Sequence, residues 1–457
     1  MTETLRSVHR QSSGGWFRTG VKLLPVSHAL ATSLLVAALA LCGCHREQGA
    51  TDSCRVPAPS IPTKVTVISY ESHGMPFFGE QMAKCSSPPM LKVRHQMLPY
   101  DELVSQATIS MSSRSPSPYD IIHVYDQLLV EWAGKGWLAP LDDLVQKYWK
   151  QYRLDEIPDS LWNMMKVNGH IYAIPAVQNP EIFLYRKDVF EKYGLKPPQT
   201  YDDLASLCKT LKANHAAPYP LLMMYTKSSD HVAYEFYDLL HSMGGKWFDE
   251  DGSPAFNSEI GRAAIAKMSE LYHACVHPDA VNFTPEDAII GLQQGQFLMG
   301  ILWANEAPQL DNPEFSKFAG KFGFAPAPGA CASCPPASYW AQDSWVIPAN
   351  ASADRELLFR IAMEGTQTKN QAKAAKLALV ARSAVSGANE SPYWQAGITT
   401  IKRGAVGLDR RTYAYLAREA ISRYAIEALL GHLTATDALD RAASDYSHAM
   451  HEEGFIK

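Results

Sequence analysis

Short apolar runs alternate with helical stretches in the first third of the chain. Residues 64–70, Lys-Val-Thr-Val-Ile-Ser-Tyr, form an apolar run that ends in a loop containing Gly74. A second run, residues 120–124, follows a segment rich in Ser and Pro at 112–118. Buried strands that alternate with helices are typical of parallel βαβ units, whose sheets are covered on both faces. The pattern therefore predicts an α/β fold.

Capping patterns mark helix starts farther along the chain. Thr200 and Asp203 have the spacing of a capping box, and Thr284 precedes a proline and two acidic residues. Asn257 precedes a third helical stretch, and a long helical region follows Ala353. The apolar positions that recur at helical spacing in the first and third stretches are Leu204, Leu207, Leu211, Ile260, Ala264, Met268 and Leu271.

The N-terminal segment, residues 1–43, has the pattern of an export signal. A basic region precedes residues 29–43, which are apolar or small and too few to span a bilayer as a stable helix. The sequence Leu-Cys-Gly-Cys at 41–44 resembles a bacterial lipobox, with the small Gly43 directly before the cleavage point. It predicts lipid attachment to Cys44 and anchoring at the cell envelope, in the periplasm or on the outer face of the cytoplasmic membrane. A plain secretory peptide and a short anchor helix are the alternatives.

Composition places the rest of the chain among ordinary globular proteins. Residues 44–62 mix Gly, Ser and Pro with charges and predict a tether, and the remainder is long enough for two or three domains. Apolar residues make up 46% of the 457 residues, and the net charge is −5. The chain lacks the excess of positive charge that is typical of nucleic-acid-binding proteins.

Six cysteines follow Cys44. An even number of cysteines outside the cytoplasm permits disulfides. We predict one disulfide between Cys208 and Cys275, on two helical stretches, and one between Cys331 and Cys334. The second pair is also compatible with a redox motif or half of a zinc site. The prolines that follow Cys334, and the lack of a second ligand pair at metal spacing, favour a structural pair.

Four segments, in this order, resemble the extracellular solute-binding proteins of ABC importers, in the branch that includes the maltose-binding proteins. They are residues 119–126 with 131–142, residues 168–175 with 183–190 and 193–204, residues 295–300 with Trp303, and residues 381–385. The last segment departs from the family pattern, because Val-Ala replaces the usual proline before Arg382. The resemblance implies a class II periplasmic-binding-protein fold, with two α/β lobes, a hinge that the chain crosses several times, and ligand in the interlobe cleft. The implied division is an N-terminal lobe of residues 63–176 and 302–343 and a C-terminal lobe of residues 177–301 and 344–457.

The candidate ligand residues follow from this resemblance and from the ends of the strand runs. Ligands of open α/β sheets bind beyond the carboxyl ends of strands, and the family places an aromatic residue ten positions before a Gly-Gly pair, where Tyr234 stands. Aromatic rings stack on the apolar faces of sugars, while carboxylates and amides bind hydroxyls. The candidates are Tyr70, Glu71, Tyr125, Asp126, Asn179, Tyr234, Trp303, Asn305, Trp340, Asp343, Trp345 and Arg382, flanked by Ser72, His73, Gln178, Glu181, Glu306, Tyr339 and Gln342.

The expected function is capture of a carbohydrate and its delivery to an ABC permease, by a monomer without cofactor or metal. An envelope enzyme acting on glycans is one alternative, since two well-placed carboxylates suffice for glycoside hydrolysis. The sequence contains neither a Gly-x-Ser-x-Gly elbow nor a P-loop. Binding of a polyol or a polyamine is the other alternative, and the combination of aromatic rings with acids suits a polyamine.

Overall fold

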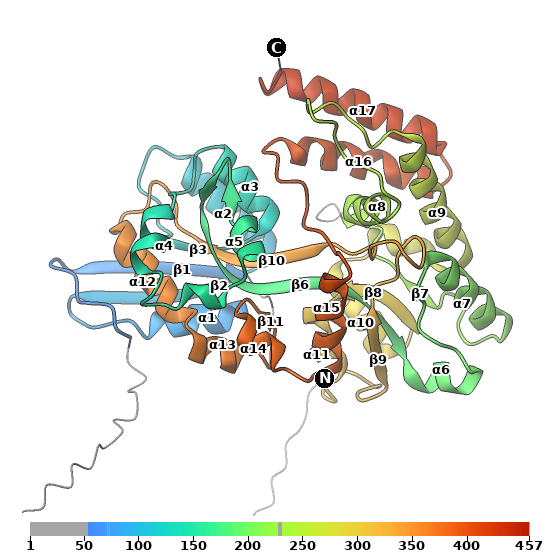
Figure 1. The fold of residues 1–457 in the computed structure, drawn as a ribbon, viewed down its shortest axis with the longest axis horizontal. Helices are drawn as coiled ribbons and strands as arrows, with labels where there is room; N and C mark the ends of the chain where they lie inside the picture. The colour runs from blue at the N-terminus through green and yellow to red at the C-terminus, as the bar shows by residue number, and fades with distance from the viewer. Residues whose placement is uncertain (1–53, 71, 73, 227–230, 457) are drawn as a thin grey trace, which may run out of the picture. The chain divides into compact units, whose positions relative to one another are not determined.

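The structure, a computed structural model, describes residues 54–456 except 71, 73 and 227–230 (Figure 1). The predicted export signal, the lipid attachment at Cys44 and the candidates Glu71 and His73 lie outside the described residues. Residues 54–62 form neither helix nor strand. Within the described part of the chain, no helix is both long enough and apolar enough to cross a membrane.

Two hydrophobic cores divide the described residues into a first and a second lobe. The first lobe contains β1 (Thr63–Tyr70), α1 (Met75–Ala83), β2 (Leu91–Leu98), α2 (Tyr100–Ser112), β3 (Ile121–Tyr125), α3 (Asp126–Gly134), α4 (Asp142–Tyr148), η1 (Leu154–Glu156), α5 (Asp159–Met164), β4 (Lys166–Val167), β5 (His170–Ile171), β10 (Trp340–Val346), α12 (Arg355–Gly365), α13 (Thr368–Ala374), β11 (Leu379–Val380) and α14 (Ser383–Gly387).

The second lobe contains α6 (Lys187–Tyr193), α7 (Tyr201–Ala213), β7 (Leu221–Leu222), α8 (His231–Ser242), α9 (Glu259–Cys275), η3 (Pro278–Asn282), α10 (Pro285–Gln294), β8 (Met299–Trp303), η4 (Ala304–Glu306), α11 (Ala307–Leu310), β9 (Phe322–Pro326), α15 (Pro392–Lys402), α16 (Ala414–Leu429) and α17 (Ala435–Glu452). Both lobes therefore combine strands with helices, as the alternating pattern predicts.

The first lobe is built on parallel strands. β1 pairs in parallel with β2 and with β3, so the predicted strands at 64–70 and 120–124 belong to βαβ units. β10 then runs antiparallel to β3 and beside β6 (Ala173–Arg186). Because the strands are buried on both faces, they consist of nearly continuous apolar runs.

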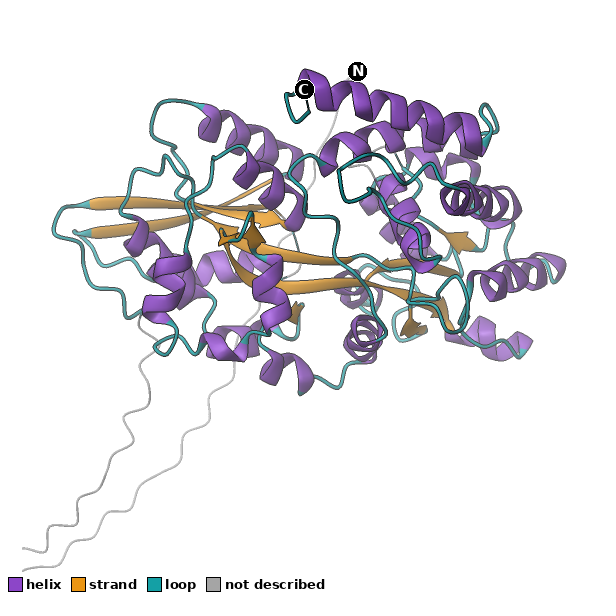
Figure 2. Ribbon diagram, turned by 45° about the horizontal axis from the view of Figure 1, so that its top comes forward, coloured by secondary structure: helices purple, strands orange, loops and turns teal. Residues whose placement is uncertain are grey.

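β6 is the strand that both lobes share. Its first half pairs with β10, and its second half, residues 181–186, pairs with β8 and β9. The main strand order is β2-β1-β3-β10-β6-β8-β7, and the strands continue from one lobe into the other (Figure 2). Because β6 pairs with strands of both lobes, it forms the first crossing between them.

The cores assign some segments differently from the predicted division. Residues 302–326 include β9 and part of β8, which pair with the second half of β6, so they lie in the second lobe rather than the N-terminal lobe. Residues 355–381 pack in the first core, whereas they were expected in the C-terminal lobe. These assignments depend on which half of β6 a distant segment pairs with, and local sequence does not encode that choice.

Local helix signals agree closely with the structure. Thr200 and Thr284 each close a capping box at the start of α7 and α10. α9 is capped by Ser258, one residue after Asn257, and its predicted apolar stripe is buried except for Ile260, which is 37% exposed. Side chains that satisfy free N–H groups at a helix start act over three residues, so sequence alone reveals them.

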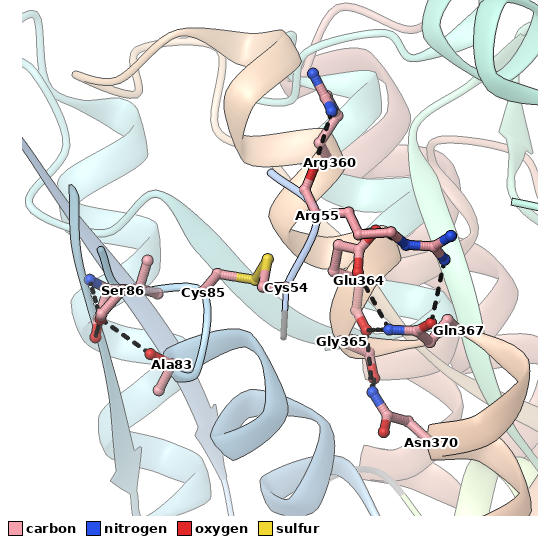
Figure 3. Close-up of a disulfide and its surroundings, with 11 residues drawn as sticks. Cys54, Arg55, Ala83, Cys85, Ser86, Arg360, Glu364, Gly365, Gln367 and Asn370 are labelled. Carbon is pink, nitrogen blue, oxygen red and sulfur yellow. Dashed lines mark hydrogen bonds and ion pairs between the residues drawn. A yellow bond between two sulfur atoms is a disulfide. The ribbon is translucent and has the colours of Figure 1, made fainter. Parts of the chain in front are cut away.

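Three disulfides are present among the described residues. The bonds Cys208–Cys275 and Cys331–Cys334 confirm the predicted pairs. Cys54 joins Cys85, just after α1, which was not predicted (Figure 3). Beside it, Arg55 lies 3.6 Å from Glu364 (Nε to Oε1) on α12, and its carbonyl accepts a hydrogen bond from Nη2 of Arg360 at 3.1 Å. The first described residues are thus fastened to the first lobe.

Candidate functional site

Five predicted residues come together where the two cores meet. Tyr70 ends β1 and Tyr125 ends β3, and these strands are parallel, so their carboxyl ends lie at one edge of the sheet. Asp126 is the first residue of α3, directly after β3. Asp343 of β10 stands opposite Tyr125 in the antiparallel ladder, and Tyr234 comes from α8 of the second lobe. Strand topology therefore brings together residues that are far apart in sequence.

Asp343 is the acceptor in a buried aromatic network of the first lobe. The Tyr70 hydroxyl donates to Asp343 Oδ1 at 2.9 Å, and Nε2 of His123 lies 2.8 Å from the same oxygen. The rings of Tyr70 and His123 stack, with centroids 4.0 Å apart and planes 15° apart. Burial, followed by the charge of Asp343, raises the pKa of Tyr70 well above its usual value, so its hydroxyl remains a proton donor.

Asp126 and the adjacent Gln127 carry the contacts to the second lobe. The hydroxyl of Tyr339 donates to Asp126 Oδ1, and both the Tyr234 hydroxyl and the Arg418 guanidinium donate to Gln127 Oε1. The rings of Tyr234 and Tyr339 stack at a centroid distance of 5.3 Å. We call Tyr70, His123, Tyr125, Asp126, Gln127, Tyr234, Tyr339, Asp343 and Arg418 the interface cluster.

Burial controls the electrostatics of Asp126. It raises the pKa of this carboxyl to about 6, and the charge of Asp343 acts in the same direction. The hydrogen bond from Tyr339 and the charge of Arg410 partly oppose the rise. Asp126 therefore changes charge within the physiological range, in a setting where a hydroxyl-bearing ligand could supply the missing donors.

Several polar atoms at or beside the cluster are buried without a hydrogen-bond partner. Such atoms are costly in a folded protein unless a bound molecule satisfies them. They include both acceptors and donors, a mixture that matches hydroxyl groups, which donate and accept. They are Asp126 Oδ2, His123 Nδ1, Gln342 Oε1, Trp303 Nε1 and Trp340 Nε1.

Trp303 and Trp340 stand on opposite sides of the same point in β6. Trp340 of β10 pairs with Pro180, and Trp303 of β8 pairs with Glu181. Trp303 is partly exposed, whereas Trp340 is 9% exposed. The two predicted tryptophans therefore flank the strand that joins the lobes.

Asn179 and Asn305 fasten segments of the chain to one another. The N–H of Asn305 donates to Asn179 Oδ1 at 3.1 Å, and Nδ2 of Asn305 donates to the carbonyl of Gln178 at 3.3 Å. The N–H of Leu379 donates to Asn305 Oδ1 at 3.0 Å. Both polar atoms of the Asn305 side chain have protein partners. In the described structure, Asn179 and Asn305 therefore stabilise the region where β6 passes between the lobes.

Trp345 and Arg382 are buried in the first lobe. Trp345 has no exposed surface and belongs to the first core. Arg382 is also fully buried, and its Nη1 donates to Glu156 Oε2 at 2.7 Å while Nη2 donates to the carbonyl of Tyr152 at 2.9 Å. These contacts do not involve the interface cluster, so we leave both residues out of the site proposed below.

Sequence reasoning missed several residues of the site. His123 is a polar residue inside an otherwise apolar strand run, which is a usable signal. Arg418 lies on α16 among buried alanine, leucine and isoleucine side chains, so a charge within an apolar helix face marks it. Gln127 and Tyr100, whose hydroxyl donates to that of Tyr125 at 3.0 Å, have no comparable signal.

Three further carboxyl groups are buried in the second lobe. Glu181 of β6 interacts electrostatically with Asp238 of α8, and the N–H of Met224 donates to Glu235 Oε1 at 3.2 Å. Burial, together with the charge that these groups exert on one another, raises all three pKa values well above the usual range. We call Glu181, Glu235 and Asp238 the acid trio. None of the ion pairs among the described residues includes any of them.

In the described part of the chain, no group of three or more His, Cys, Asp or Glu side chains is arranged to hold a metal ion. The chemistry that the interface cluster offers is hydrogen bonding from tyrosine, carboxylate and amide groups beside aromatic rings. This combination suits binding of a small polar molecule with apolar faces.

Comparison with known proteins agrees with this geometry. The profile described as bacterial extracellular solute-binding protein matches residues 89–362. A mannitol-binding protein of Pseudomonas aeruginosa is 25% identical over 181 residues, which cover 39% of this chain and 40% of that protein. An uncharacterised ABC transporter extracellular-binding protein of Pyrococcus horikoshii is 24% identical over 311 residues, covering 64% and 66% of the two chains. The chain thus spans about two fifths of the first relative and just under two thirds of the second.

Solved structures share the fold along nearly their whole length. Maltose-bound MalE3 of T. maritima superposes with a TM-score of 0.73 at 20% identity, covering 84% of this chain and 99% of the other. A solute-binding protein from Agrobacterium vitis S4 with bound D-mannitol gives 0.70 at 21% identity, covering 86% and 99%. At these identities the likeness concerns the fold, and it confirms the predicted two-lobed α/β class. The matching family and these neighbours are binding proteins rather than enzymes.

Proposed function

Because the chain belongs to the bacterial extracellular solute-binding protein family, we propose that it captures a neutral polyhydroxylated molecule, a sugar or a sugar alcohol, at the interface cluster. The observation that carries the proposal is the pair of buried carboxyl groups, Asp126 and Asp343, surrounded by tyrosine side chains from both lobes. A ligand that contacts both lobes stabilises the closed arrangement over the open one.

The residue chemistry supports hydroxyl groups as the recognised feature. Carboxylates and amides accept hydrogen bonds from hydroxyls, and tyrosine rings cover the C–H faces of a sugar or polyol. Relatives named for mannitol, ribitol and maltose support the same class of ligand.

Positive charge at the cluster argues against a polyamine. Arg418 donates to Gln127, and Arg410 acts on Asp126 while its Nε donates to the carbonyl of Lys166 at 3.3 Å. Two guanidinium groups beside the carboxyls would repel a polycationic ligand. A neutral polyol leaves these ionic contacts undisturbed.

The proposal extends to location and partner. Cys44 would carry the lipid that holds the chain at the cell envelope, and an ABC permease would receive the ligand. Labelling of the full chain with an alkyne analogue of palmitate tests the anchor. We expect the label on the natural chain and its loss in Cys44→Ala; equal labelling of both would overturn this part of the proposal.

Ligand binding is tested with a calorimetric panel of D-mannitol, ribitol, maltose and spermidine. We expect saturable binding of at least one polyol or sugar and none of spermidine. Asp343→Asn removes a charged acceptor whose hydrogen bonds each contribute about 1.5–3 kcal/mol, so affinity should fall roughly 10- to 100-fold.

Asp155→Asn is the matched control, because Asp155 is an exposed acid of the first lobe outside the interface cluster. Its affinity should remain within twofold of the natural chain. Equal affinity of Asp343→Asn and the natural chain would contradict the placement of the site. Tight binding of spermidine would contradict the ligand class.

A further inference from the structure

A cavity lies in the second lobe, at the C-terminal half of α8. Its volume is about 240 Å³. This is slightly below the usual range for sites of drug-sized ligands, so it suits a molecule of monosaccharide size. The residues that line it are Tyr237, Leu240, His241, Gly245, Lys246, Trp247, Phe248, Asp409 and Arg411.

The cavity is separated from the interface cluster by contacts along one face of α8. Tyr234, Tyr237 and His241 have the spacing of a single helix face, with Tyr234 in the cluster and the other two in the cavity wall. The Tyr237 hydroxyl donates to the carbonyl of Gly407 at 3.0 Å, and Leu408 packs against Tyr234. The two sites therefore share a helix but have different walls.

Aromatic rings form the apolar part of the wall. The rings of Tyr237 and His241 are nearly parallel, with planes 15° apart, and both side chains are partly exposed. Trp247 meets Tyr237 edge-on, with centroids 5.2 Å apart and planes 83° apart. Burial lowers the pKa of His241, so its ring is uncharged at neutral pH. A flat ligand face fits against such a platform.

The polar part of the wall has an excess of hydrogen-bond donors. Trp247 Nε1 and Arg411 Nη1 are buried without an acceptor, and Lys246 is exposed. Asp409 is the one acid among the lining residues; its Oδ1 accepts from the backbone N–H of Arg411 at 3.0 Å and lies 4.0 Å from Nε of the same residue. Asp409 partly compensates the charge of Arg411, and Lys246 adds a second positive charge, so the net positive charge of the lining favours an anionic ligand.

We propose that this cavity is a second binding site, for a small ring-bearing carboxylate. The ring rests on the Tyr237 and His241 platform, and the carboxylate pairs with Lys246 and Arg411. Two classes of compound share this chemistry, the hexuronic acids and the aromatic acids. The site is independent of the function proposed for the interface cluster.

The test is a titration of the full chain with D-glucuronate, benzoate and D-glucose, followed by calorimetry and tryptophan fluorescence. We expect at least one carboxylate to bind saturably and to change the fluorescence, and the change to be lost in Trp247→Phe. Binding of glucuronate alone assigns a sugar acid as ligand, whereas binding of benzoate alone assigns an aromatic acid. Glucose lacks the carboxylate and should give no Trp247-dependent signal.

Charge reversal at the cavity supplies the decisive variant. Lys246→Glu should weaken carboxylate binding at least tenfold, while Lys209→Glu, an exposed lysine of the same lobe on α7, should change it less than twofold. Asp343→Asn should leave carboxylate binding intact, which separates this site from the interface cluster. The proposal is overturned if neither carboxylate binds, if both lysine variants behave alike, or if only Asp343→Asn abolishes binding.

Discussion

The two lobes bury charge in opposite ways. In the first lobe, Arg382 and Glu156 form a buried ion pair with further hydrogen bonds to backbone carbonyls. In the second lobe, the three carboxyls of the acid trio are buried together without an ion pair to any described base. The first lobe neutralises its buried carboxylate with a guanidinium group, whereas the buried carboxyls of the second lobe stay protonated and therefore uncharged.

This difference gives the lobes opposite responses to pH. Burial alone would raise the pKa of Glu156, but hydrogen bonds from Thr368 and Arg382 and the charge of Arg382 lower it. The ion pair therefore stabilises the first lobe above about pH 4 and loses this effect as the pH falls through the lowered pKa. The raised pKa values of the acid trio have the opposite effect. These carboxyls ionise in the unfolded chain above about pH 4 but stay protonated in the folded chain, so the stability of the second lobe falls as the pH rises.

The largest expected effect comes from breaking the ion pair. Arg382→Met leaves Glu156 buried without its partner, which should cost about 3–5 kcal/mol of unfolding free energy at pH 7, measured by urea denaturation. Arg153 pairs with the same carboxylate from the surface, where its side chain is 68% exposed. Arg153→Gln should therefore cost less than about 1 kcal/mol. Similar losses in the two variants would show that burial does not set the strength of the pair.

Removing one disulfide from each lobe compares how much unfolding free energy each bond contributes by restricting the unfolded chain. Cys208→Ala with Cys275→Ala opens a loop between residues 67 positions apart and should cost about 2–4 kcal/mol. Cys54→Ala with Cys85→Ala opens a shorter loop, with a separation of 31, and should cost about 0.7 kcal/mol less by loop entropy. Urea midpoints under non-reducing conditions measure both. A larger loss in the first lobe would mean that contacts such as Arg55 with Glu364 depend on the bond.

The smallest expected effect is a gain that depends on pH. Glu235→Gln keeps the acceptor for the Met224 N–H but cannot ionise, so it should add about 1 kcal/mol at pH 8 and almost nothing at pH 4. Glu191, an exposed acid on α6, offers the control Glu191→Gln, which should change stability by less than about 0.5 kcal/mol at both values. An equal change in Glu235→Gln at pH 4 and pH 8 would contradict protonation of the trio.

Local sequence signals predicted the elements well because the forces that create them are local. Strands β1 and β3 and the capped helices α7 and α10 follow from apolar runs and from side chains within a few residues. The division into lobes did not follow in the same way. It depends on which half of β6 is paired by β8, β9 and β10, and such pairings join distant segments.

The residues of the candidate site show the same contrast between local and long-range information. Tyr70, Tyr125 and Asp126 were predictable because the carboxyl ends of parallel strands share an edge. Arg382 followed from a motif, yet its side chain enters the first lobe, and no feature of its neighbours in sequence distinguishes a buried ion pair from a ligand contact. Arg418 is marked in the sequence as a charge within the apolar face of α16, but its partner Gln127 in the first lobe is seen only in the folded structure.

The Cys54–Cys85 bond would limit the reach of the chain if, as proposed, a lipid at Cys44 holds it at a membrane. Ten residue steps separate Cys44 from Cys54, so a fully extended chain between the proposed lipid site and the first lobe spans at most about 35 Å. Without the bond and the contacts of Arg55, the free chain would reach from Cys44 to Thr63, where β1 begins, and would span at most about 65 Å. Under the proposed anchoring, the crosslink would therefore shorten the distance that the first lobe can reach from the bilayer.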